Sequence, residues 1–475
     1  MSKPDYSDSP SFQDIVNPWT GEIAQRFPVA SARDVCNAIN RAERAFDRAR
    51  RATSAERSDI LHRTSELILS SRNRLVSVIV AEAGKPLALA EAEVDRAAAT
   101  FRFAAAEAIQ YRAEGLAIDA SAAGRFHWGC ALRFPIGTIL GITPFNFPLN
   151  LVAHKVAPAI ASGNTILLKP APQAPTAARI LAELLGEAGL PEGQCQVLLF
   201  PNDQTEVVLA HPSVAMLSFT GSVPAGWHLK RMAVRQKSTL ELGGNAAVVI
   251  EPDSNWEEAI PLIARAAFGY AGQSCISVQR ILVHSSIREA FCRQFVEWTC
   301  AHVVSGDPGL WETLVGPMIS PSARERAASW SAAALREGAK ALLTPESRGY
   351  ALSTPGIFED VPLESPLWTD EVFAPVVAIK EYTDFDEALR VVNSSRFGLQ
   401  AGVFTPRFDR ALKAHSELRV GGVLINQVPT FRVENMPYGG VKDSGTGREG
   451  VRYAMEEMTE LRSLVVRLPQ EVSAS

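Results

Sequence analysis

Apolar residues recur at helical spacing through the first quarter of the chain. Between Ala32 and Glu114 they return every three or four positions, as in AERSDILHRTSELILSSRNRLVSVIVAEAGK and EVDRAAATFRFAAAEAI, and this spacing predicts two or three long amphipathic helices. The next segment, GLAIDASAAGRFHWGCALRFPIGT, alternates apolar and polar residues and carries Gly124 at an expected turn. It predicts a hairpin that projects from the domain.

Short apolar runs then alternate with helix-like stretches. GTILGIT, NTILLKP, CQVLLFP, AMLSFTG and AAVVIEP are separated by segments such as TAARILAELLGEAG, which is typical of a parallel sheet covered by helices. A second alternation runs from Trp256 to Asn426, with strands expected at QRILVHS, PVVAIKEY, AGVFTP and GGVLINQ. We therefore expect an α/β protein with two successive sheet-and-helix units. The closing LRSLVVRLP predicts one more strand, at the edge of a sheet.

Length and composition place the chain among ordinary globular proteins. Its 475 residues predict two or three packed units rather than one small module, and 47% hydrophobic with 21% charged residues excludes disorder as the main state. The formal charge is -5, and neither sign gathers into a long run. We therefore expect no nucleic-acid partner, because phosphate-backbone binding needs a basic surface.

No membrane segment, metal site or disulfide is expected. The first residues lack a basic patch followed by an apolar run, so the cytoplasm is the expected location. The uncharged stretch from Phe134 to Ala153 has the length of a membrane span, but Pro135, Pro144 and Pro148 would break a lipid-exposed helix. The six cysteines form no CxxC pair and have no histidine-rich companion, which argues against disulfides and a zinc site.

Three side chains suggest chemistry at a carbonyl carbon. Cys275 follows small residues in GYAGQSC, and its thiol is either a nucleophile or a small buried apolar group. Glu241 ends an expected strand in STLELGGN and is either a base for water or a strand-end charge. Asn146 lies between two prolines in ITPFNFPLN, where a rigid amide either stabilises an oxyanion or satisfies a turn. Together they describe thiol attack, a tetrahedral adduct and hydrolysis of a thioester.

Two further positions suit a phosphate or a ribose. LSFTGSVPAG places Gly221 and Gly226 between an expected strand and an expected helix, where backbone N–H groups either bind a pyrophosphate or form an ordinary tight turn. Lys169 ends the strand of TILLKPAPQAP and suits a ribose or phosphate at the carboxyl edge of a parallel sheet.

The order of these motifs resembles the aldehyde dehydrogenase superfamily. PFNFP, LLKP, FTGS, LELGG, GQSC, EVFAP and PYGGVKDSGTGREG follow one another between Ile15 and Val465, and the chain is most similar to lactaldehyde, phosphonoacetaldehyde and succinate-semialdehyde types. The resemblance implies a Rossmann-like cofactor domain, an α/β catalytic domain and a small β oligomerisation element. The cofactor domain would comprise residues 1–114 and 137–242, to which the chain returns at 444–460. The catalytic domain would comprise 243–443, and the oligomerisation element 115–136 and 461–475.

The resemblance also implies a role for each matching residue. Cys275 would be the nucleophile, Asn146 with the Cys275 N–H the oxyanion hole, Glu241 the activator of the deacylating water, and Lys155 with Glu449 a proton relay. The implied cofactor contacts are the riboses for Lys169 and Glu371, the pyrophosphate for Ser222 and the nicotinamide face for Phe373, together with Thr143, Pro144, Phe145, Gly221 and Leu242. Members that pass the acyl group to coenzyme A typically lack the base at Glu241, so a free acid is the implied product.

A substrate pocket is implied less directly. Arg102, His154 and Arg432 would hold an anionic or hydroxylated aldehyde by charge-assisted hydrogen bonds; the alternatives are a solvated helix charge for Arg102 and a packed core histidine for His154. The expected lining of the pocket is Phe147, Ser274, Ile276 and Phe431.

Three positions depart from common versions of the family. Pro172 stands where a glutamate often binds the adenosine ribose, so NADP is expected to be tolerated beside NAD. Ser274 precedes the nucleophile, where relatives that grip phosphorylated substrates can carry arginine, and Ala374 replaces the glycine of EVFGPV.

The sequence thus predicts an NAD(P)-dependent enzyme that oxidises a small polar or anionic aldehyde to the acid, as a homodimer or homotetramer. The alternatives are a succinate-semialdehyde-type enzyme and a non-catalytic descendant that retains cofactor binding. A cysteine hydrolase is a further alternative, but such a site usually needs a histidine near the thiol, and His284 has no evident orienting partner.

Overall fold

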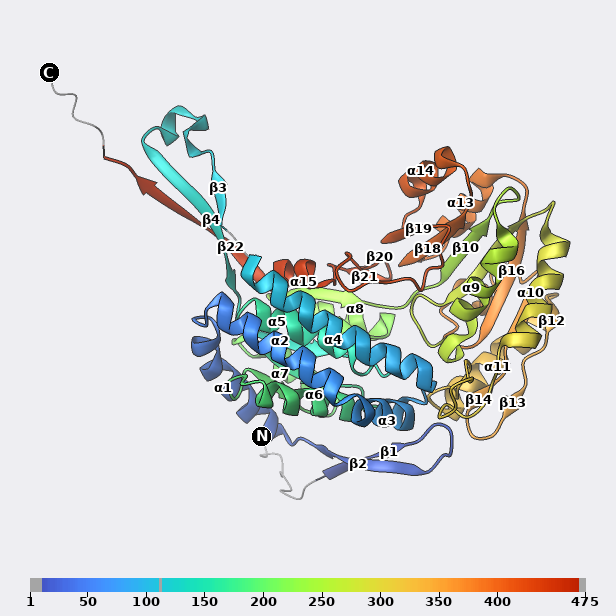
Figure 1. Ribbon diagram of the computed structural model, residues 1–475, viewed down its shortest axis with the longest axis horizontal. Coiled ribbons are helices and arrows are strands. Elements are labelled where there is room, and N and C mark those ends of the chain that lie inside the picture. The colour runs from blue at the N-terminus through green and yellow to red at the C-terminus, as the bar shows by residue number, and fades with distance from the viewer. Residues whose placement is uncertain (1–10, 111–112, 470–475) are drawn as a thin grey trace, which may run out of the picture.

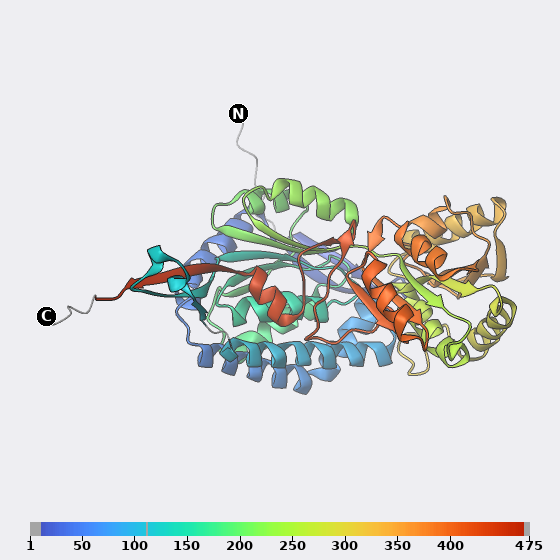
Figure 2. The same cartoon turned by 90° about the horizontal axis from the view of Figure 1, so that it is seen from above.

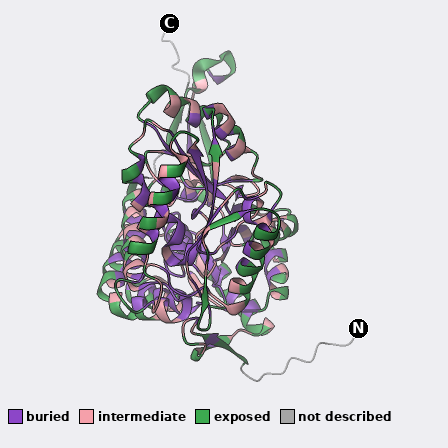
Figure 3. Cartoon of the chain, turned by 90° about the vertical axis from the view of Figure 1, so that its right-hand side faces the viewer, coloured by how far each residue is buried: buried purple, intermediate pink, exposed green. Residues whose placement is uncertain are grey.

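The computed structural model describes residues 11–110 and 113–469, which form two sheet-and-helix units and a projecting arm (Figures 1 and 2). The expected α/β fold is confirmed. Buried residues gather around the strands, whereas the outer faces of the helices are exposed (Figure 3). No helix within the two described ranges is long and apolar enough to cross a bilayer.

The first sheet has six strands in the order β21-β9-β8-β5-β6-β7, all parallel except β21. Its strands are β5 (Thr138–Ile142), β6 (Thr165–Lys169), β7 (Cys195–Val197), β8 (Val214–Thr220), β9 (Lys237–Glu241) and β21 (Gly445–Thr446). Every residue of β6 is buried, because helices cover both faces of the sheet. The helices are α1 (Ala32–Ala49), α2 (Ser54–Ser70), α3 (Arg72–Ala83), α4 (Leu87–Gln110), α5 (Asn150–Ala161), α6 (Thr176–Glu187), α7 (Asp203–Ala210), α8 (Val223–Met232) and α15 (Val451–Glu457).

The number of helices in the N-terminal helical region was predicted too low. Four helices, α1 to α4, stand where two or three were expected. The side chain of Thr53 and that of Glu56 form a capping box that begins α2, and Gly84, in the left-handed conformation, ends α3. A capping box and a left-handed glycine end one helix and begin another without changing the spacing of the apolar residues. That spacing alone therefore does not show where the helices divide.

The second sheet has seven strands in the order β12-β15-β16-β11-β10-β18-β19, parallel except at β12. Its strands are β10 (Ala246–Ile250), β11 (Val278–His284), β12 (Lys340–Leu343), β15 (Gly356–Glu359), β16 (Val376–Tyr382), β18 (Gln400–Phe404) and β19 (Gly422–Ile425). The helices around it are α9 (Trp256–Phe268), α10 (Arg288–His302), α11 (Pro321–Arg336), α12 (Pro366–Thr369), α13 (Phe385–Asn393) and α14 (Phe408–Glu417). The strands expected in both alternating regions are therefore confirmed.

The arm is a three-stranded sheet in the order β22-β4-β3. The expected hairpin is present as β3 (Glu114–Leu116) and β4 (His127–Pro135), and the expected last strand, β22 (Thr459–Arg467), pairs antiparallel with β4 over its whole length. Figures 1 and 2 show that this sheet extends away from both units. Smaller hairpins are formed by β1 (Ser11–Val16) with β2 (Ile23–Val29) and by β13 (Ser347–Arg348) with β14 (Leu352–Ser353), while β17 (Phe397–Gly398) pairs with β20 (Val441–Lys442).

Candidate active site

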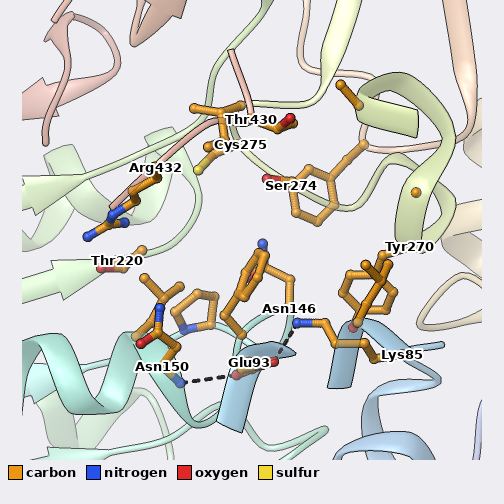
Figure 4. A pocket seen from close by; sticks show the side chains of 18 of the residues that line it. Lys85, Glu93, Asn146, Asn150, Thr220, Tyr270, Ser274, Cys275, Thr430 and Arg432 are labelled. Atoms are coloured by element: carbon orange, nitrogen blue, oxygen red, sulfur yellow. Dashed lines mark hydrogen bonds and ion pairs between the residues drawn. The ribbon is translucent and has the colours of Figure 1, made fainter. Parts of the chain in front are cut away.

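A cavity of about 700 Å³ opens where the two units meet. The first unit contributes residues at the ends of β8 and β9, such as Thr220 and Glu241, and the second contributes the segment before β11, with Cys275. Figure 4 shows Cys275 and Arg432 on one side of this cavity and Lys85 on the other. The carboxyl ends of parallel strands are the usual place for a ligand in such sheets.

The loop that carries Cys275 is held in an unusual backbone conformation. Tyr270 and Ala271 have φ of 53°, and Gly272 has φ of 66°. A Cβ atom on Gly272 would lie 2.2 Å from the carbonyl oxygen of Ala374, so only glycine fits the turn. Gln273, fully buried, fixes the turn from inside by donating to the Pro317 carbonyl at 3.2 Å and accepting from the Ile319 N–H at 2.8 Å.

Cys275 presents its thiol to the cavity. Its Sγ lies 3.1 Å from the hydroxyl of Tyr438. Burial raises the pKa of the Cys275 thiol to about 12, the hydrogen bond with Tyr438 opposes that rise, and the guanidinium of Arg432 lowers it slightly. The Cys275 thiol therefore becomes reactive only when its thiolate form is stabilised, because the thiolate is the nucleophilic form.

Asn146 lies in the loop between β5 and α5 and lines the same cavity. Its Nδ2 donates to the carbonyl of Gln273 at 3.0 Å, which ties this loop to the residue two before Cys275. The loop is held from behind by Glu93, whose Oε1 accepts from the N–H groups of Leu149 and Asn150 at 2.9 and 3.0 Å and so caps the start of α5. The amide of Asn146 is thus fixed in the wall of the cavity that also contains the thiol, with a second Nδ2 hydrogen to donate.

Glu241 ends β9 with its carboxylate in the cavity lining. Neither carboxylate oxygen has a hydrogen-bond partner among the described residues. Burial, followed by repulsion from Glu449, raises the pKa of Glu241 well above its usual value, while Arg432 and Lys155 act in the opposite direction. A carboxyl whose pKa is raised holds a proton more readily than a free carboxyl does and suits a role in proton transfer.

Lys155 and Glu449 form a buried ion pair beside Glu241. Lys155 Nζ lies 3.0 Å from Glu449 Oε1 and donates to Ser218 Oγ at 3.1 Å, and Arg432 Nη2 lies 3.3 Å from Glu449 Oε2. Although burial opposes it, the attraction of Lys155 and Arg432 lowers the pKa of Glu449 to about 2. The pair expected from the sequence is therefore brought together, close enough to influence Glu241.

The expected cofactor residues fall into two groups. Thr143 and Lys169 are buried at the carboxyl ends of β5 and β6. Thr143 N–H donates to the Lys169 carbonyl at 3.1 Å, and Lys169 Nζ donates to Asn202 Oδ1 at 2.8 Å. Burial lowers the pKa of Lys169. The cavity lining contains the others, which are Pro144, Phe145, Gly221, Ser222, Leu242, Glu371 and Phe373.

The lining fits a dinucleotide at four positions. Ser222 is the N-cap residue of α8 but makes no capping hydrogen bond, so its hydroxyl and the N–H groups of the first turn are available to a pyrophosphate. Thr220 Oγ1, nearby, is buried and has no partner among the described residues. Glu371 accepts from the Gly244 N–H at 2.9 Å, and burial raises its pKa to about 7. Phe373 meets Phe145 edge to face at 6.0 Å, giving an aromatic wall.

Part of the expected substrate pocket is not where the sequence placed it. Phe147, Ser274, Ile276 and Arg432 line the cavity, whereas Arg102, His154 and Phe431 are absent from its described lining. Arg102 is exposed because it lies on the outer face of α4, while Arg96 on the same helix faces the cavity. His154 is a buried histidine hydrogen-bonded to Glu434, and burial lowers its pKa. Phe431 is 45% exposed.

His284 also lies away from the thiol. Its Nδ1 is 2.8 Å from Ser286 Oγ at the exposed end of β11, and the described lining of the cavity contains no histidine. This arrangement removes the support for a cysteine hydrolase with a histidine base.

Several lining residues were not predicted, among them Lys85, Glu93, Arg96 and Tyr438. Lys85 Nζ lies 2.5 Å from Glu93 Oε2, with both side chains buried in the cavity wall, and 3.5 Å from the centre of the half-buried Phe147 ring. Burial lowers the pKa of Lys85 to about 8. The lysine of AGKP carries no chemical signal in sequence, but Tyr438 lies within the PYGG motif and was within reach of sequence reasoning.

Comparisons with known proteins agree with this geometry. A model of the aldehyde dehydrogenase family matches residues 6–464. The chain is 40% identical to a 3-sulfolactaldehyde dehydrogenase of Priestia megaterium, over 96% of this chain and 95% of that protein. The crystal structure of aldehyde dehydrogenase 21 from Physcomitrella patens, in complex with the reaction product succinate, is 36% identical with a TM-score of 0.94, covering 99% and 97% of the two chains. The glyceraldehyde-3-phosphate dehydrogenase GapN of Methanocaldococcus jannaschii, complexed with NADP, is 36% identical with a TM-score of 0.91, covering 97% and 100%.

A half-buried thiol, a rigid amide and a carboxyl lie around one cavity, as expected of an oxidoreductase that acts on aldehydes. The chain belongs to the aldehyde dehydrogenase family. The expected family, its fold and the NAD(P)-dependent oxidoreductase class are thereby confirmed.

Proposed function

We propose that the chain oxidises a small anionic aldehyde to its carboxylic acid with NAD(P)+, through Cys275. The observation that carries the substrate class is the charge of the cavity wall. Its lining includes three carboxylates, Glu93, Glu241 and Glu371, and five cationic side chains, which are Lys85, Arg96, Arg265, Arg326 and Arg432. Burial raises the pKa of both Glu241 and Glu371, so the wall favours negatively charged ligands.

In the first step, the Cys275 thiolate adds to the aldehyde carbon and the carbonyl oxygen becomes an oxyanion. The remaining Nδ2 hydrogen of Asn146 and the N–H of Cys275 would donate to that oxygen, and removal of one such oxyanion-hole donor from an enzyme costs about 3 to 4 kcal/mol. When bound, NAD(P)+ supplies the oxidant by accepting a hydride from the former aldehyde carbon. Glu371, Phe373 and Ser222 would hold it in the wall described above.

In the second step, Glu241 would take a proton from water as the water adds to the Cys275 thioester. The C–S bond then breaks, the thiolate leaves and the carboxylic acid is released. The unpartnered carboxylate of Glu241 is free to bind that water. Lys155 and Glu449, joined at 3.0 Å, would carry the proton onward from Glu241.

Arg432 is the proposed anchor for the acid group of the aldehyde. Its side chain is buried in the lining, its Nη2 pairs with Glu449, and its Nε has no partner among the described residues. A guanidinium keeps its charge and offers a planar set of donors to a carboxylate, sulfonate or phosphate. Three relatives point the same way, since sulfolactaldehyde, succinate and glyceraldehyde 3-phosphate each carry an acid group.

The test compares rates of reduced-nicotinamide formation with lactaldehyde, succinate semialdehyde, phosphonoacetaldehyde and glyceraldehyde 3-phosphate. We expect a preference for anionic aldehydes that Arg432→Gln removes through a raised KM, while Arg102→Gln, on the exposed face of α4, leaves it unchanged. Cys275→Ala is the blank. Preference for neutral lactaldehyde would contradict the role of Arg432 as an anchor but would still support aldehyde oxidation through Cys275. Selectivity for succinate semialdehyde would identify the alternative substrate, and silence of the wild type with every aldehyde would favour a non-catalytic descendant.

We propose that both NAD and NADP serve as cofactor. Pro172 is exposed in the turn after β6, near the carboxyl edge where Lys169 lies, and it brings no carboxylate to repel a 2'-phosphate. Parallel rates with the two cofactors test this proposal. Pro172→Glu is expected to lower the rate with NADP selectively.

The remaining assignments are proposals about the whole molecule. The sheets support the division of the chain, because β5 to β9 and β21 share one sheet, β3, β4 and β22 share another, and the seven-stranded sheet is built from β10, β11, β12, β15, β16, β18 and β19. All six cysteines are free, which fits a reducing compartment such as the cytoplasm. The proposed regions are 1–114, 137–242 and 444–460 for the cofactor, 243–443 for catalysis, and 115–136 with 461–475 for assembly; residues 1–10, 111–112 and 470–475 lie outside the described part.

The arm is the proposed site of assembly into a homodimer or homotetramer. Leu461, Leu464 and Val465 on β22, together with Trp128 on β4, are between 49% and 54% exposed. β22 is at the edge of its sheet, so one side of its backbone is unpaired within the described chain. Exposed apolar side chains on a free strand edge are features of a protein interface.

A further inference from the structure

One hydroxyl group with no role in the mechanism above lies against the nucleophile. The Oη of Tyr438 is 3.1 Å from the Sγ of Cys275, and it is the hydrogen bond that the described residues give to that sulfur. The contact joins residues that are far apart in sequence, because Tyr438 comes from the segment after β19. It is therefore a product of the tertiary fold.

Tyr438 is held so that its hydroxyl stays at the sulfur. The residue is 4% exposed, and its ring packs with Ile276 and Leu399. Its backbone pairs in both directions with Glu449, whose carbonyl accepts from Tyr438 N–H at 3.0 Å and whose N–H donates to the Tyr438 carbonyl at 2.7 Å. A preorganised donor costs little reorganisation when charge develops beside it.

A cation lies on the face of the Tyr438 ring. The guanidinium carbon of Arg432 is 3.7 Å from the ring centre. A cation over an aromatic ring is attracted to its π face, and it withdraws electron density, which makes the phenol a stronger hydrogen-bond donor. Burial, in contrast, raises the pKa of Tyr438 well above its usual value, so the phenol keeps its proton at neutral pH.

Among the groups that can activate a cysteine, the described residues around Cys275 supply the cation Arg432 but neither a histidine nor an α-helix N-terminus. The described lining of the cavity contains no histidine to form a thiolate–imidazolium pair. Cys275 follows a short 3-10 turn and precedes a strand, so it does not begin an α-helix. A histidine and a helix N-terminus are two of the ways in which a protein stabilises a thiolate.

We propose that Tyr438 is a catalytic residue that activates the nucleophile by donating a hydrogen bond to the Cys275 thiolate. The thiol proton leaves to a water molecule in the cavity, the sulfur becomes an acceptor only, and the phenol, made a better donor by Arg432, keeps its proton. The inference deepens the nucleophilic role given to Cys275 under the proposed function. It assigns the thiol an activator from the PYGG motif rather than a general base.

The test measures alkylation of Cys275 by iodoacetamide as a function of pH, without aldehyde or cofactor, followed by mass spectrometry of the Cys275 peptide. In Tyr438→Phe we expect the apparent pKa of Cys275 to rise and its alkylation at pH 7 to slow by about ten- to a hundredfold, as for loss of a hydrogen bond to a charged group. The rates should converge at high pH. Tyr382→Phe, which removes a buried phenol bonded to the Ile250 carbonyl in the second sheet, should alkylate like the wild type.

An unchanged profile in a folded Tyr438→Phe would overturn the proposal. If that variant does not fold, 3-fluorotyrosine incorporated at position 438 gives a more acidic phenol of nearly the same size, and it should lower the apparent pKa of Cys275; no change would again overturn the role. The readout separates this inference from the proposed function. A shifted profile in a chain that oxidises no aldehyde would keep the role of Tyr438 and reject the dehydrogenase, whereas normal oxidation with an unshifted profile would do the reverse.

Discussion

A Cβ atom on Gly244 would lie 2.1 Å from the carbonyl oxygen of Cys275. The segment after β9 therefore passes the nucleophile loop at a distance that only a hydrogen at this position allows. Gly244 lies in the segment that joins β9, which ends with Glu241, to β10 of the second unit, and this segment passes directly against the backbone of Cys275. The spacing of the proposed base and the nucleophile depends on it.

Gly244→Ala tests this dependence. The new methyl group must push the loop of Cys275 away, and a displacement of about 1 Å in a catalytic group can cost on the order of a hundredfold in rate. We expect kcat for aldehyde oxidation to fall by about that factor. The control is Gly186→Ala, since Gly186 lies in α6 with open space around its Cα. It should keep its activity and gain about 0.5 to 1 kcal/mol in unfolding free energy. Wild-type turnover in Gly244→Ala would show that the loop can yield.

Glu241→Gln should separate the two halves of the reaction. The amide cannot take a proton from water, so the acyl group should remain on Cys275 after one turnover. Rapid mixing is expected to give a burst of about one reduced nicotinamide per subunit, followed by slow steady-state release. Because the pKa of Glu241 is raised, the wild-type steady-state rate should rise with pH as this carboxyl loses its proton, and the variant should lack that limb. A variant with neither burst nor turnover would place Glu241 before hydride transfer.

The fold was accessible from the sequence because its strands are short apolar runs between helical segments. All residues of β10 are buried, as expected of a strand covered on both faces. Helix number was harder to predict, because Thr53 and Gly84 interrupt a continuous apolar period.

The site was accessible only where a residue carries a chemical signal of its own. Cys275, Glu241 and Asn146 do, and the structure brings them to one cavity. Arg102 and Arg96 share α4, and the face of the helix that meets the cavity is decided by tertiary packing rather than by charge. For the same reason, no local pattern indicates that Lys85 and Glu93 form a buried pair in that wall, or that the hydroxyl of Tyr438 reaches a sulfur 163 positions away.

Lys85→Ala is expected to lower the unfolding free energy of the protein much more than a substitution in an exposed ion pair does. Lys85 and Glu93 are 1% and 0% exposed and lie 2.5 Å apart. Removal of one partner leaves a buried charge uncompensated, at about 3 to 5 kcal/mol. Urea unfolding should show this loss. The exposed pair of Arg348 with Glu346 provides the control, since Arg348→Ala should change the unfolding free energy by less than about 1 kcal/mol. Equal effects of the two substitutions would contradict the buried pairing.

Val465→Asp should dissociate the proposed assembly. Val465 is 51% exposed on the edge strand β22, and a charge there would oppose both apolar contact and strand pairing. Light scattering coupled to size exclusion is expected to show a fall in mass from the oligomer to a smaller species. Val234→Asp, at an 84% exposed valine after α8, should leave the mass unchanged. A wild-type chain that is monomeric at micromolar concentration would remove the basis for this prediction.

Glu82 should make the stability of the protein depend on pH. Its Oε2 accepts from the Thr176 N–H at 3.1 Å, its Oε1 has no partner among the described residues, and burial raises its pKa from 4.5 to about 7. The folded state therefore binds this proton more tightly than the unfolded state does. The resulting stability is fully present below pH 4.5 and is lost as pH rises through 7, to a total of about 3 kcal/mol. Glu82→Gln accepts the same N–H without ionising, so its unfolding free energy should fall less between pH 5 and pH 8 than that of the wild type. Glu187→Gln, at an exposed position at the end of α6, should show the same pH dependence of the unfolding free energy as the wild type. Parallel pH profiles for all three proteins would mean that Glu82 is ionised in the folded state at pH 5.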